Sequence, residues 1–315
     1  MIPLTGFNSL VDLIKAFPNE QSCIDHLERI RWNANVVSPF DPSSKVYKCK
    51  GNKYKCKTTG KYFNVRTSTI FEDTKMPLQK WFIALYIFSS HKKGISSHQL
   101  AKDLDITQKS AWFVLHRLRY AFDHPAFKKM LSKTVEIDET YIGGKEHNKH
   151  ASKKKYAKGQ KRINNKAAVF GMVDRESKTV IASHVDFSDD GVTEYLVTKY
   201  VSQEATLISD NSDLYNPLKE YYDHQIINHG AKEYVRGMAH TNTIEGFWSQ
   251  LKRGVDGIYH WVSVKHLQRY VQEYALRYNT RTIREDQRFN VVLTNMVGRL
   301  TYADLIRKKH SQKSN

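Results

Sequence analysis

The sequence predicts a mixed α/β domain in the second half of the chain, preceded by a small β module and a group of helices. Beyond Lys133, strand-like segments are interleaved with a helical segment at 190–203, and they occupy 134–142, 166–174, 179–187 and 205–210. Strands and helices that alternate in this way favour a sheet covered by helices. Long helical patterns follow from about 242 to 283. The chain has 315 residues, 40% of them apolar, which is enough for several domains.

The first half of the chain changes pattern twice. Residues 7–32 have helical spacing with a break at Pro18-Asn19, which predicts two short helices. Residues 45–72 then alternate aromatic, β-branched and basic side chains around Gly51 and Gly60, a pattern typical of small hairpins. A helical period returns after Pro77.

The charge of the chain indicates a polyanionic partner. Lys and Arg total 50 against 32 Asp and Glu, which gives a formal net charge of +18. Nucleic acid is the commonest such partner, and an anionic membrane the rarer one. The longest apolar run, residues 81–88, is too short to span a bilayer, and the first residues lack the features of a signal peptide. We therefore expect a cytoplasmic protein without a membrane partner, and the odd cysteine count fits a reducing compartment.

A helix-turn-helix is predicted at residues 94–122. Two helical patterns flank the turn "DLDIT", and Thr107 is placed to cap the second helix. A recognition helix meets base edges near its start and phosphates further along. The expected DNA-binding residues here are Gln108, Lys109, Ser110, Arg117 and Arg119. An ordinary helical hairpin is the alternative, and the charge of the chain favours DNA binding.

The small β module has the outline of a zinc ribbon with an incomplete ligand set. Structural zinc takes four ligands, usually from two Cys-x2-Cys pairs. Cys56 begins such a pair, but Thr59 stands at its partner position, and Ser38 and Asp41 stand where a second pair would be. Zinc held by Cys49, Cys56 and a borrowed His or Asp is the alternative. We expect no structural zinc, and we expect the module to be packed by Tyr47, Tyr54, Tyr62 and Phe63.

Acidic residues from three segments are the candidate catalytic groups. In the strand at 134–142, Glu136 and Asp138 should point to one face and Glu139 to the other, so one of these acids is expected to be functional. Asp210 ends a second apolar strand, a favourable place for chemistry. Glu245 lies in a predicted helix, where it shares a face with the residues Ser249 and Lys252.

Two strand acids and one helix acid can converge on a pair of divalent cations. We expect Asp138, Asp210 and Glu245 to hold two magnesium or manganese ions, because hard cations prefer oxygen ligands. Such ions activate a water or a 3′-hydroxyl and stabilise the departing oxygen in a phosphodiester displacement. Asn242, one turn before Glu245, could also reach a metal. The spare acids nearby are Asp213 and Glu136.

A basic segment separates the first two predicted strands. Residues 145–166 contain nine Lys or Arg and a single Glu, and a solvated loop of this kind would repel itself. We expect an arm that orders on DNA phosphates through Lys153, Lys154 and Lys155 and reads charge rather than sequence. In the last long helix, an apolar stripe from Leu267 to Tyr278 favours core packing over contact with DNA.

Three blocks carry a resemblance to a known family: "VEIDETYIGGK", "SDNSDLY" and "HTNTIEGFWSQLKRGVDGIYHWVSVKHLQRYVQEYALRYNTR". They resemble the catalytic blocks of the DDE transposases of bacterial insertion sequences whose catalytic domain is called ISXO-two-like, relatives of the Merlin transposons of eukaryotes. The resemblance covers most residues from about 25 to 285. The third block is the most specific, because it matches the family's spacing at His240, Asn242, Glu245, Trp248, Lys252 and Arg253.

This resemblance implies an α/β catalytic domain of RNase H-like (retroviral integrase-like) fold. Asp138, Asp210 and Glu245 would be its metal-binding triad, Lys252 would hold a phosphate near the scissile bond, and Arg253 would contact DNA. Members of the family usually carry a complete zinc ribbon, and a Gly where this chain has Ser68. The need to bring two DNA ends together implies a homodimer or a higher oligomer.

We expect four parts along the chain: N-terminal helices with a degenerate zinc-ribbon-like module at 1–74, a helix-turn-helix at 75–128, the catalytic domain at 129–290, and a C-terminal helix with a basic tail at 291–315. The expected function is an insertion-sequence transposase that binds terminal inverted repeats and catalyses metal-dependent cleavage and strand transfer of double-stranded DNA, at the nucleoid of a bacterial cell. One alternative is a decayed copy that only binds DNA. Another is a junction-resolving nuclease, which leaves the helix-turn-helix unexplained.

Overall fold

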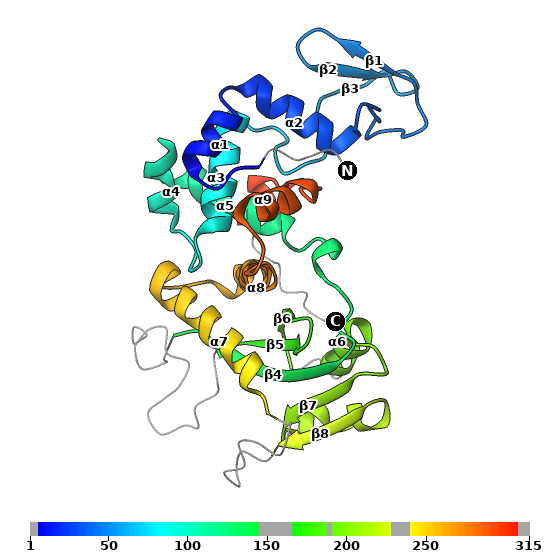
Figure 1. The fold of residues 1–315 in the computed structure, drawn as a ribbon, viewed down its shortest axis with the longest axis vertical. Helices are drawn as coiled ribbons and strands as arrows, with labels where there is room; N and C mark the ends of the chain where they lie inside the picture. The colour runs from blue at the N-terminus through cyan, green and yellow to red at the C-terminus, as the bar shows by residue number, and fades with distance from the viewer. Residues whose placement is uncertain (1–5, 145–165, 188–190, 228–239, 308–315) are drawn as a thin grey trace. The chain divides into compact units, whose positions relative to one another are not determined.

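The computed structural model describes residues 6–144, 166–187, 191–227 and 240–307, and it forms two compact units (Figure 1). Unit 1 combines residues up to 124 with those from 283 onward, and unit 2 spans 125–282. This division differs from the four expected parts, because the last helices return to the N-terminal ones. The Ile70 N–H, for example, donates to the Met296 carbonyl at 3.4 Å. Most of the predicted DNA arm, and the tail beyond 307, lie outside the described residues.

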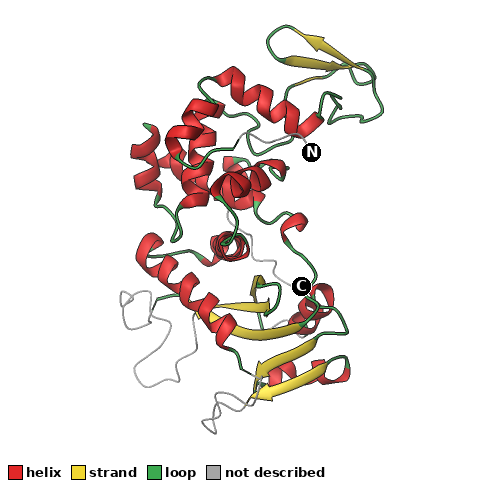
Figure 2. Ribbon diagram, in the orientation of Figure 1, coloured by secondary structure: helices red, strands yellow, loops and turns green. Residues whose placement is uncertain are grey.

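Unit 1 is mainly helical (Figure 2). Its helices are α1 (Leu10–Ala16), α2 (Glu20–Trp32), α3 (Leu78–Ser90), α4 (Ser97–Leu104), α5 (Gln108–Ala121), α9 (Glu285–Thr294) and α10 (Tyr302–Ile306). The expected break between the first two helices is confirmed, because the Asn19 side chain caps α2 by accepting the Ser22 N–H at 2.9 Å. Within the described residues, no helix combines the length and apolar character that crossing a membrane requires.

Helices α4 and α5 flank the turn "DLDIT", as the two helical patterns predicted, and that they form a DNA-binding helix-turn-helix stays a prediction. The Thr107 hydroxyl accepts the Ser110 N–H at 3.2 Å, so Thr107 caps α5 as predicted. Asp105 ends α4 in the left-handed conformation, which turns the chain toward α5. The apolar side chains between the helices are buried, and they include Leu100, Leu104, Ala111, Val114 and Leu115.

The small β module is an antiparallel sheet of β1 (Val46–Cys49), β2 (Lys53–Cys56) and β3 (Tyr62–Phe63). Tyr54 and Phe63 are buried and meet the Trp32 ring of α2, with ring centroids 5.3 and 6.1 Å apart. The expectation for Tyr47 and Tyr62 was wrong, because both are exposed. Each of them pairs across the sheet with Lys55, so the three side chains share the outward face.

Hydroxyl groups surround the remaining thiol of this module. Cys56 is buried, and hydrogen bonds from the side chains of Ser38, Ser44 and Thr59 lower the pKa of its thiol to about 6. Ser38 in turn accepts the N–H groups of Phe40 and Asp41, at 3.1 and 3.4 Å. Ser38 and Thr59, which stand where a zinc ribbon would have cysteines, therefore form hydrogen bonds to Cys56 through their hydroxyl groups. That the module binds no zinc stays a prediction.

Unit 2 is built on a five-stranded sheet in the order β6-β5-β4-β7-β8 (Figure 2). Its strands are β4 (Thr134–Ile142), β5 (Ala167–Asp174), β6 (Thr179–Val185), β7 (Thr206–Asp210) and β8 (Asp223–Ile227). β5 runs antiparallel to β4 and β6, whereas β4, β7 and β8 are parallel. The helical segments are η1 (Pro125–Phe127), α6 (Val192–Tyr200), η4 (Asp213–Glu220), α7 (Asn242–Gly254), η6 (Val255–Tyr259) and α8 (Val264–Asn279).

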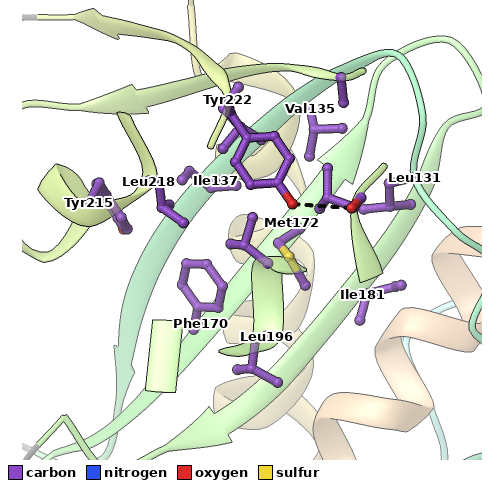
Figure 3. Close-up of a cluster of buried hydrophobic side chains, with 14 of the residues drawn as sticks. Leu131, Val135, Ile137, Phe170, Met172, Ile181, Leu196, Tyr215, Leu218 and Tyr222 are labelled. Carbon is purple, nitrogen blue, oxygen red and sulfur yellow. Dashed lines mark hydrogen bonds between the residues drawn. The ribbon is translucent and has the colours of Figure 1, made fainter. Parts of the chain in front are cut away.

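Helices cover both faces of this sheet. On one face, α6 and η4 pack on a cluster that includes Ile137, Phe170 and Met172, and the Tyr222 hydroxyl closes it by donating to the Val201 carbonyl at 3.2 Å (Figure 3). On the other face, α7 and α8 pack on Val169, Val173 and Ala182. The apolar stripe of α8 lies in this second cluster, which confirms the expected core packing.

A glycine lets α7 approach the second face closely. Gly171 of β5 lies opposite Asp138 in the ladder, and a Cβ there would come 2.5 Å from the Trp248 ring of α7. Any larger residue would force Trp248 away from the sheet, at a cost of about 1–3 kcal/mol for overpacking. The glycine therefore fixes the distance between α7 and the strand that carries the first candidate acid.

Candidate active site

The candidate site lies where β4 and β7 separate. The two strands pair in parallel as far as Glu136 and Ile208. Two residues further along each strand stand Asp138 and Asp210, so the same register places these acids side by side. The carboxyl ends of parallel strands are a common location for chemistry in α/β sheets.

Three carboxylates come together at this point. One oxygen from each of Asp138, Glu139 and Asp210 lies within 4.8 Å of the other two, and all three residues are partly buried. Asp138 and Asp210 meet as the sequence predicted. Glu139 was expected to point away from them, but β4 has left its partner strand here, and its side chain reaches the same cluster.

Asp138 is held by the helix above the sheet. The Trp248 Nε1–H of α7 donates to Asp138 Oδ2 at 2.9 Å. Burial raises the pKa of Asp138 to about 7, and the charges of Glu139 and Asp210 act in the same direction, while the Trp248 hydrogen bond opposes them. The carboxylates therefore repel one another in a partly desolvated position.

Glu139 is held from the opposite face. The Tyr215 hydroxyl of η4 donates to Glu139 Oε2, and the Tyr215 ring is fully buried in the first core cluster. Burial raises the pKa of Glu139, and it also raises the pKa of Tyr215 together with the adjacent carboxylate charge. The phenol consequently stays a hydrogen-bond donor at neutral pH.

Glu136 has a structural role beside the cluster. Its carboxylate is 0% exposed and accepts the Arg175 Nε–H at 2.6 Å and the Ile244 N–H at 2.9 Å. Arg175 also donates to the His240 carbonyl, and the His240 Nδ1 lies 3.4 Å from Glu136. Glu136 thus binds the first turn of α7 to β4, and it does not replace Asp138 in the cluster.

α7 carries the remaining predicted residues of the site. Glu245 is exposed and lies between Ile244, which bonds to Glu136, and Trp248, which bonds to Asp138. Its Oε1 accepts the Thr241 hydroxyl at 3.2 Å. Of the described residues, Glu245 is not among those whose carboxylates gather within 4.8 Å. The structure therefore leaves Glu245 outside the cluster, on a helix whose neighbouring residues Ile244 and Trp248 bond to β4.

The exposed face of α7 is polar. Lys252 lies on it two turns after Glu245, and Asn242 stands exposed at the start of the helix. Arg253 is exposed in the last turn, where its Nε–H donates to the Ser249 carbonyl at 3.1 Å. These residues remain available to a ligand that lies along α7.

The predicted DNA contacts of α5 divide into two groups. Gln108, Lys109 and Ser110 are exposed at the start of the helix. The expectation for Arg117 and Arg119 was wrong, since both are buried within unit 1. Lys153, Lys154 and Lys155 lie outside the described residues.

The burial of the two arginines has a clear cause. The Arg117 guanidinium donates to the carbonyl groups of Ile70, Glu72 and Leu300, at 2.9 to 3.0 Å, and stacks on Phe113. Arg119 lies over the Phe88 ring. The segment around Leu300 covers the Arg117 side of α5, so Arg117 holds backbone segments together, and neither buried arginine faces solvent.

The acidic cluster fits a divalent cation. Its donors are carboxylate oxygens, which magnesium and manganese prefer, and they already converge from two strands. Burial raises the pKa of Asp138 and of Glu139, and the charges of the neighbouring carboxylates add to both shifts. A bound cation would relieve that mutual repulsion.

Sequence reasoning missed Tyr215, Trp248 and Arg175 as supports of the acids. Tyr215 follows Asp210 by five positions, and this spacing predicts no contact with an acid. The contact with Glu139 forms only because η4 packs against the sheet. Trp248 was named as a position at the family's spacing; its ring is buried, and its indole N–H donates to Asp138. Only the register of the sheet brings Arg175, in the turn after β5, beside Glu136.

The comparison with protein families assigns this domain. Residues 130–279 match the family model described as an ISXO2-like transposase domain, and this range holds the whole acidic cluster and α7. This match agrees with the family resemblance that the three sequence blocks carry, and it assigns residues 130–279 to an ISXO2-like transposase domain.

Two further comparisons concern a curated relative and a solved structure. The chain is 26% identical over 276 residues to the "Uncharacterized protein in transposable element ISH50" of Halobacterium salinarum, across 84% of this chain and 92% of that protein. A chain from the "Crystal structure of a pre-cleavage Mos1 transpososome" aligns with 69% of this chain and 79% of its own length, at 8% identity and a TM-score of 0.16. A score this low carries no argument about fold or partners.

Proposed function

We propose that the protein is an insertion-sequence transposase that binds the terminal inverted repeats of its element and catalyses metal-dependent DNA strand cleavage and strand transfer. The observation that carries this proposal is the cluster of Asp138, Glu139 and Asp210 within an ISXO2-like transposase domain. A net charge of +18 on a chain with a concentrated acidic cluster suits a polyanionic substrate held against cations.

Unit 2 is proposed to have the RNase H-like (retroviral integrase-like) fold. Support comes from the strand order β6-β5-β4-β7-β8 with a single antiparallel strand, β5. The two neighbouring parallel strands β4 and β7 supply Asp138 and Asp210, and the helix packed beside them supplies Glu245.

In this proposal, Asp138, Glu139 and Asp210 hold divalent cations, and Glu245 completes the site from α7. Bound magnesium or manganese supplies the activation of a water or a 3′-hydroxyl and the stabilisation of the departing oxygen. Trp248 and Tyr215 orient two of the carboxylates. These supports keep the acids in place when no cation neutralises them.

DNA is proposed to contact both units. On α7, Lys252 would hold a phosphate near the scissile bond and Arg253 would contact the backbone, because both are exposed beyond Glu245. In unit 1, the exposed start of α5 would read bases. Its residues are Gln108, Lys109 and Ser110.

The assembly follows from the reaction. Synapsis of two element ends and a target DNA calls for a homodimer or a higher oligomer on DNA. The proposed location is the nucleoid in the cytoplasm, where the substrate is found.

The test is a cleavage and strand-joining assay on DNA that carries the element's own ends. Wild-type protein should cut and join in magnesium or manganese, and Glu245→Gln should abolish both reactions while end binding persists. Glu204→Gln serves as a matched control, because Glu204 is exposed in unit 2 away from the cluster. Equal activity of wild type and Glu245→Gln would refute the assigned role.

A decayed copy that only binds DNA is the second candidate. It is favoured by Ser68, which stands where members of the resembled family usually carry Gly and adopts φ of 61°, a conformation that costs a non-glycine residue energy. Tight end binding without cleavage by the wild-type protein, in either metal, would support this candidate over the first.

A further inference from the structure

The corner between α7 and α8 presents an aromatic side chain to solvent. α7 continues into the π-helix η6, and the chain then turns through His260 to Trp261 before α8 begins at Val264. Trp261 is 71% exposed, the highest fraction among the large apolar side chains of the described residues, and Val264 is 56% exposed. We call residues 252–265 the α7–α8 corner; Figure 1 shows the two helices that flank it.

This corner is anchored to the core of unit 2. The Tyr259 hydroxyl donates to Glu273 at 2.7 Å, and the Tyr259 and Tyr270 rings meet edge to face with centroids 4.8 Å apart. Just beyond Tyr259, His260 has φ of 57°, in the left-handed region that is costly for a non-glycine residue. The strained backbone at His260 thus holds Trp261 outside the core at a conformational cost. The preceding element, η6, is a π-helix, and π-helical turns are frequent at functional sites.

The charges around Trp261 identify the class of partner. The exposed basic side chains of the corner are those of Lys252, Arg253 and Lys265, and its exposed acid is Asp256. The buried centre of a protein–protein interface is apolar and depleted of charged residues. An exposed aromatic ring among cations is instead the arrangement that binds single-stranded nucleic acid, where the ring stacks on a base and the cations hold phosphates.

The position of the corner relates it to the acidic cluster. From Glu245 to Tyr259 the chain is continuously helical, which at 1.5 Å per residue spans about 20 Å. Successive nucleotides of one DNA strand are about 3.4 Å apart, so this length corresponds to about six nucleotides. DNA that follows α7 from the cluster reaches Trp261 within that distance.

We propose that Trp261 stacks on an unpaired base of the bound DNA, about six nucleotides from the cleaved phosphate, with Arg253 and Lys265 on the flanking phosphates. This inference rests on the proposed function and adds to it a site for an unstacked base. A flat ring can accept any base, so the site reads the absence of pairing and not the sequence.

The test compares binding of three probes without divalent metal: oligo-dT, a fully paired duplex, and the same duplex with one unpaired base. Trp261→Ala should weaken binding of oligo-dT and of the unpaired-base duplex by about fivefold to a hundredfold, and leave the paired duplex within about twofold. Trp261→Phe should restore most of the affinity. Tyr195→Ala, which removes another exposed aromatic ring of unit 2, should bind all three probes like wild type.

Several outcomes would overturn the inference. Equal affinity of Trp261→Ala and wild type for every probe would do so, and so would an equal loss on all three, which indicates damage to the fold or to charge. A change of oligomeric state with unaltered DNA affinity would assign Trp261 to a protein contact. If wild-type protein binds none of the probes, the proposed function fails as well. If it binds them and Trp261→Ala binds them equally well, only the proposed stacking site is refuted.

Discussion

Replacement of the buried carboxylate of Glu136 is the most informative perturbation of the fold around the site. Glu136→Ala removes the acceptor that Arg175 and the Ile244 N–H share, and so releases the start of α7 from β4. Loss of one partner from a buried ion pair costs about 3–5 kcal/mol. For a unit of this size, each kcal/mol lowers the melting temperature by about 2–4 °C, so we expect a decrease of about 6–20 °C.

Differential scanning calorimetry of metal-free protein measures this decrease. Glu136→Gln should lose less stability than Glu136→Ala, because the amide oxygen can still accept the Ile244 N–H. Glu204→Ala is the control, and an exposed substitution of this kind should change stability by less than about 0.5 kcal/mol. If Glu136→Ala and Glu204→Ala have the same melting temperature, the Glu136 carboxylate does not hold α7 on β4, and the prediction is refuted.

Three further predictions concern both units. Ser68→Gly should stabilise unit 1 by about 0.5–1 kcal/mol in urea unfolding, because it relieves the left-handed backbone; a loss of stability would contradict this. Arg117→Ala should cost at least about 3 kcal/mol, since three backbone carbonyls lose their donor. A stable variant with weakened DNA binding would show instead that Arg117 faces DNA. Calorimetric titration should find manganese affinity about tenfold lower at about pH 6 than at about pH 8, because protons compete below the pKa of Asp138, which is about 7. Affinity that does not change over this range would rule out Asp138 as the titrating ligand.

The strands of unit 2 could be predicted because their apolar residues form short buried runs. The predicted segment 134–142 coincides with β4, and 205–210 differs from β7 by one residue. β8 was missed because "DHQII" is mostly polar, and it becomes a strand only by pairing with β7 at the edge of the sheet.

The candidate site was predictable in part. Asp210 ends an apolar strand, so the pattern alone marks it, whereas Asp138 lies within β4 beside two other acids and was selected with the help of the family resemblance. The place of Glu139 in the cluster could not be predicted from strand alternation, because β4 and β7 separate before that residue. The role of Arg117 could not be foreseen either, since the segment that covers it is nearly two hundred residues away in sequence.

The most direct test of the account is a manganese titration of wild-type protein, Asp210→Asn and Glu204→Gln, followed by calorimetry. The wild type and the Glu204 variant should bind manganese saturably and with equal affinity. Asp210→Asn should bind at least about tenfold more weakly, because loss of a direct ligand should cost no less than loss of a group that supports one. Equal affinity of all three proteins would contradict the assignment of the acidic cluster as the cation site of a transposase.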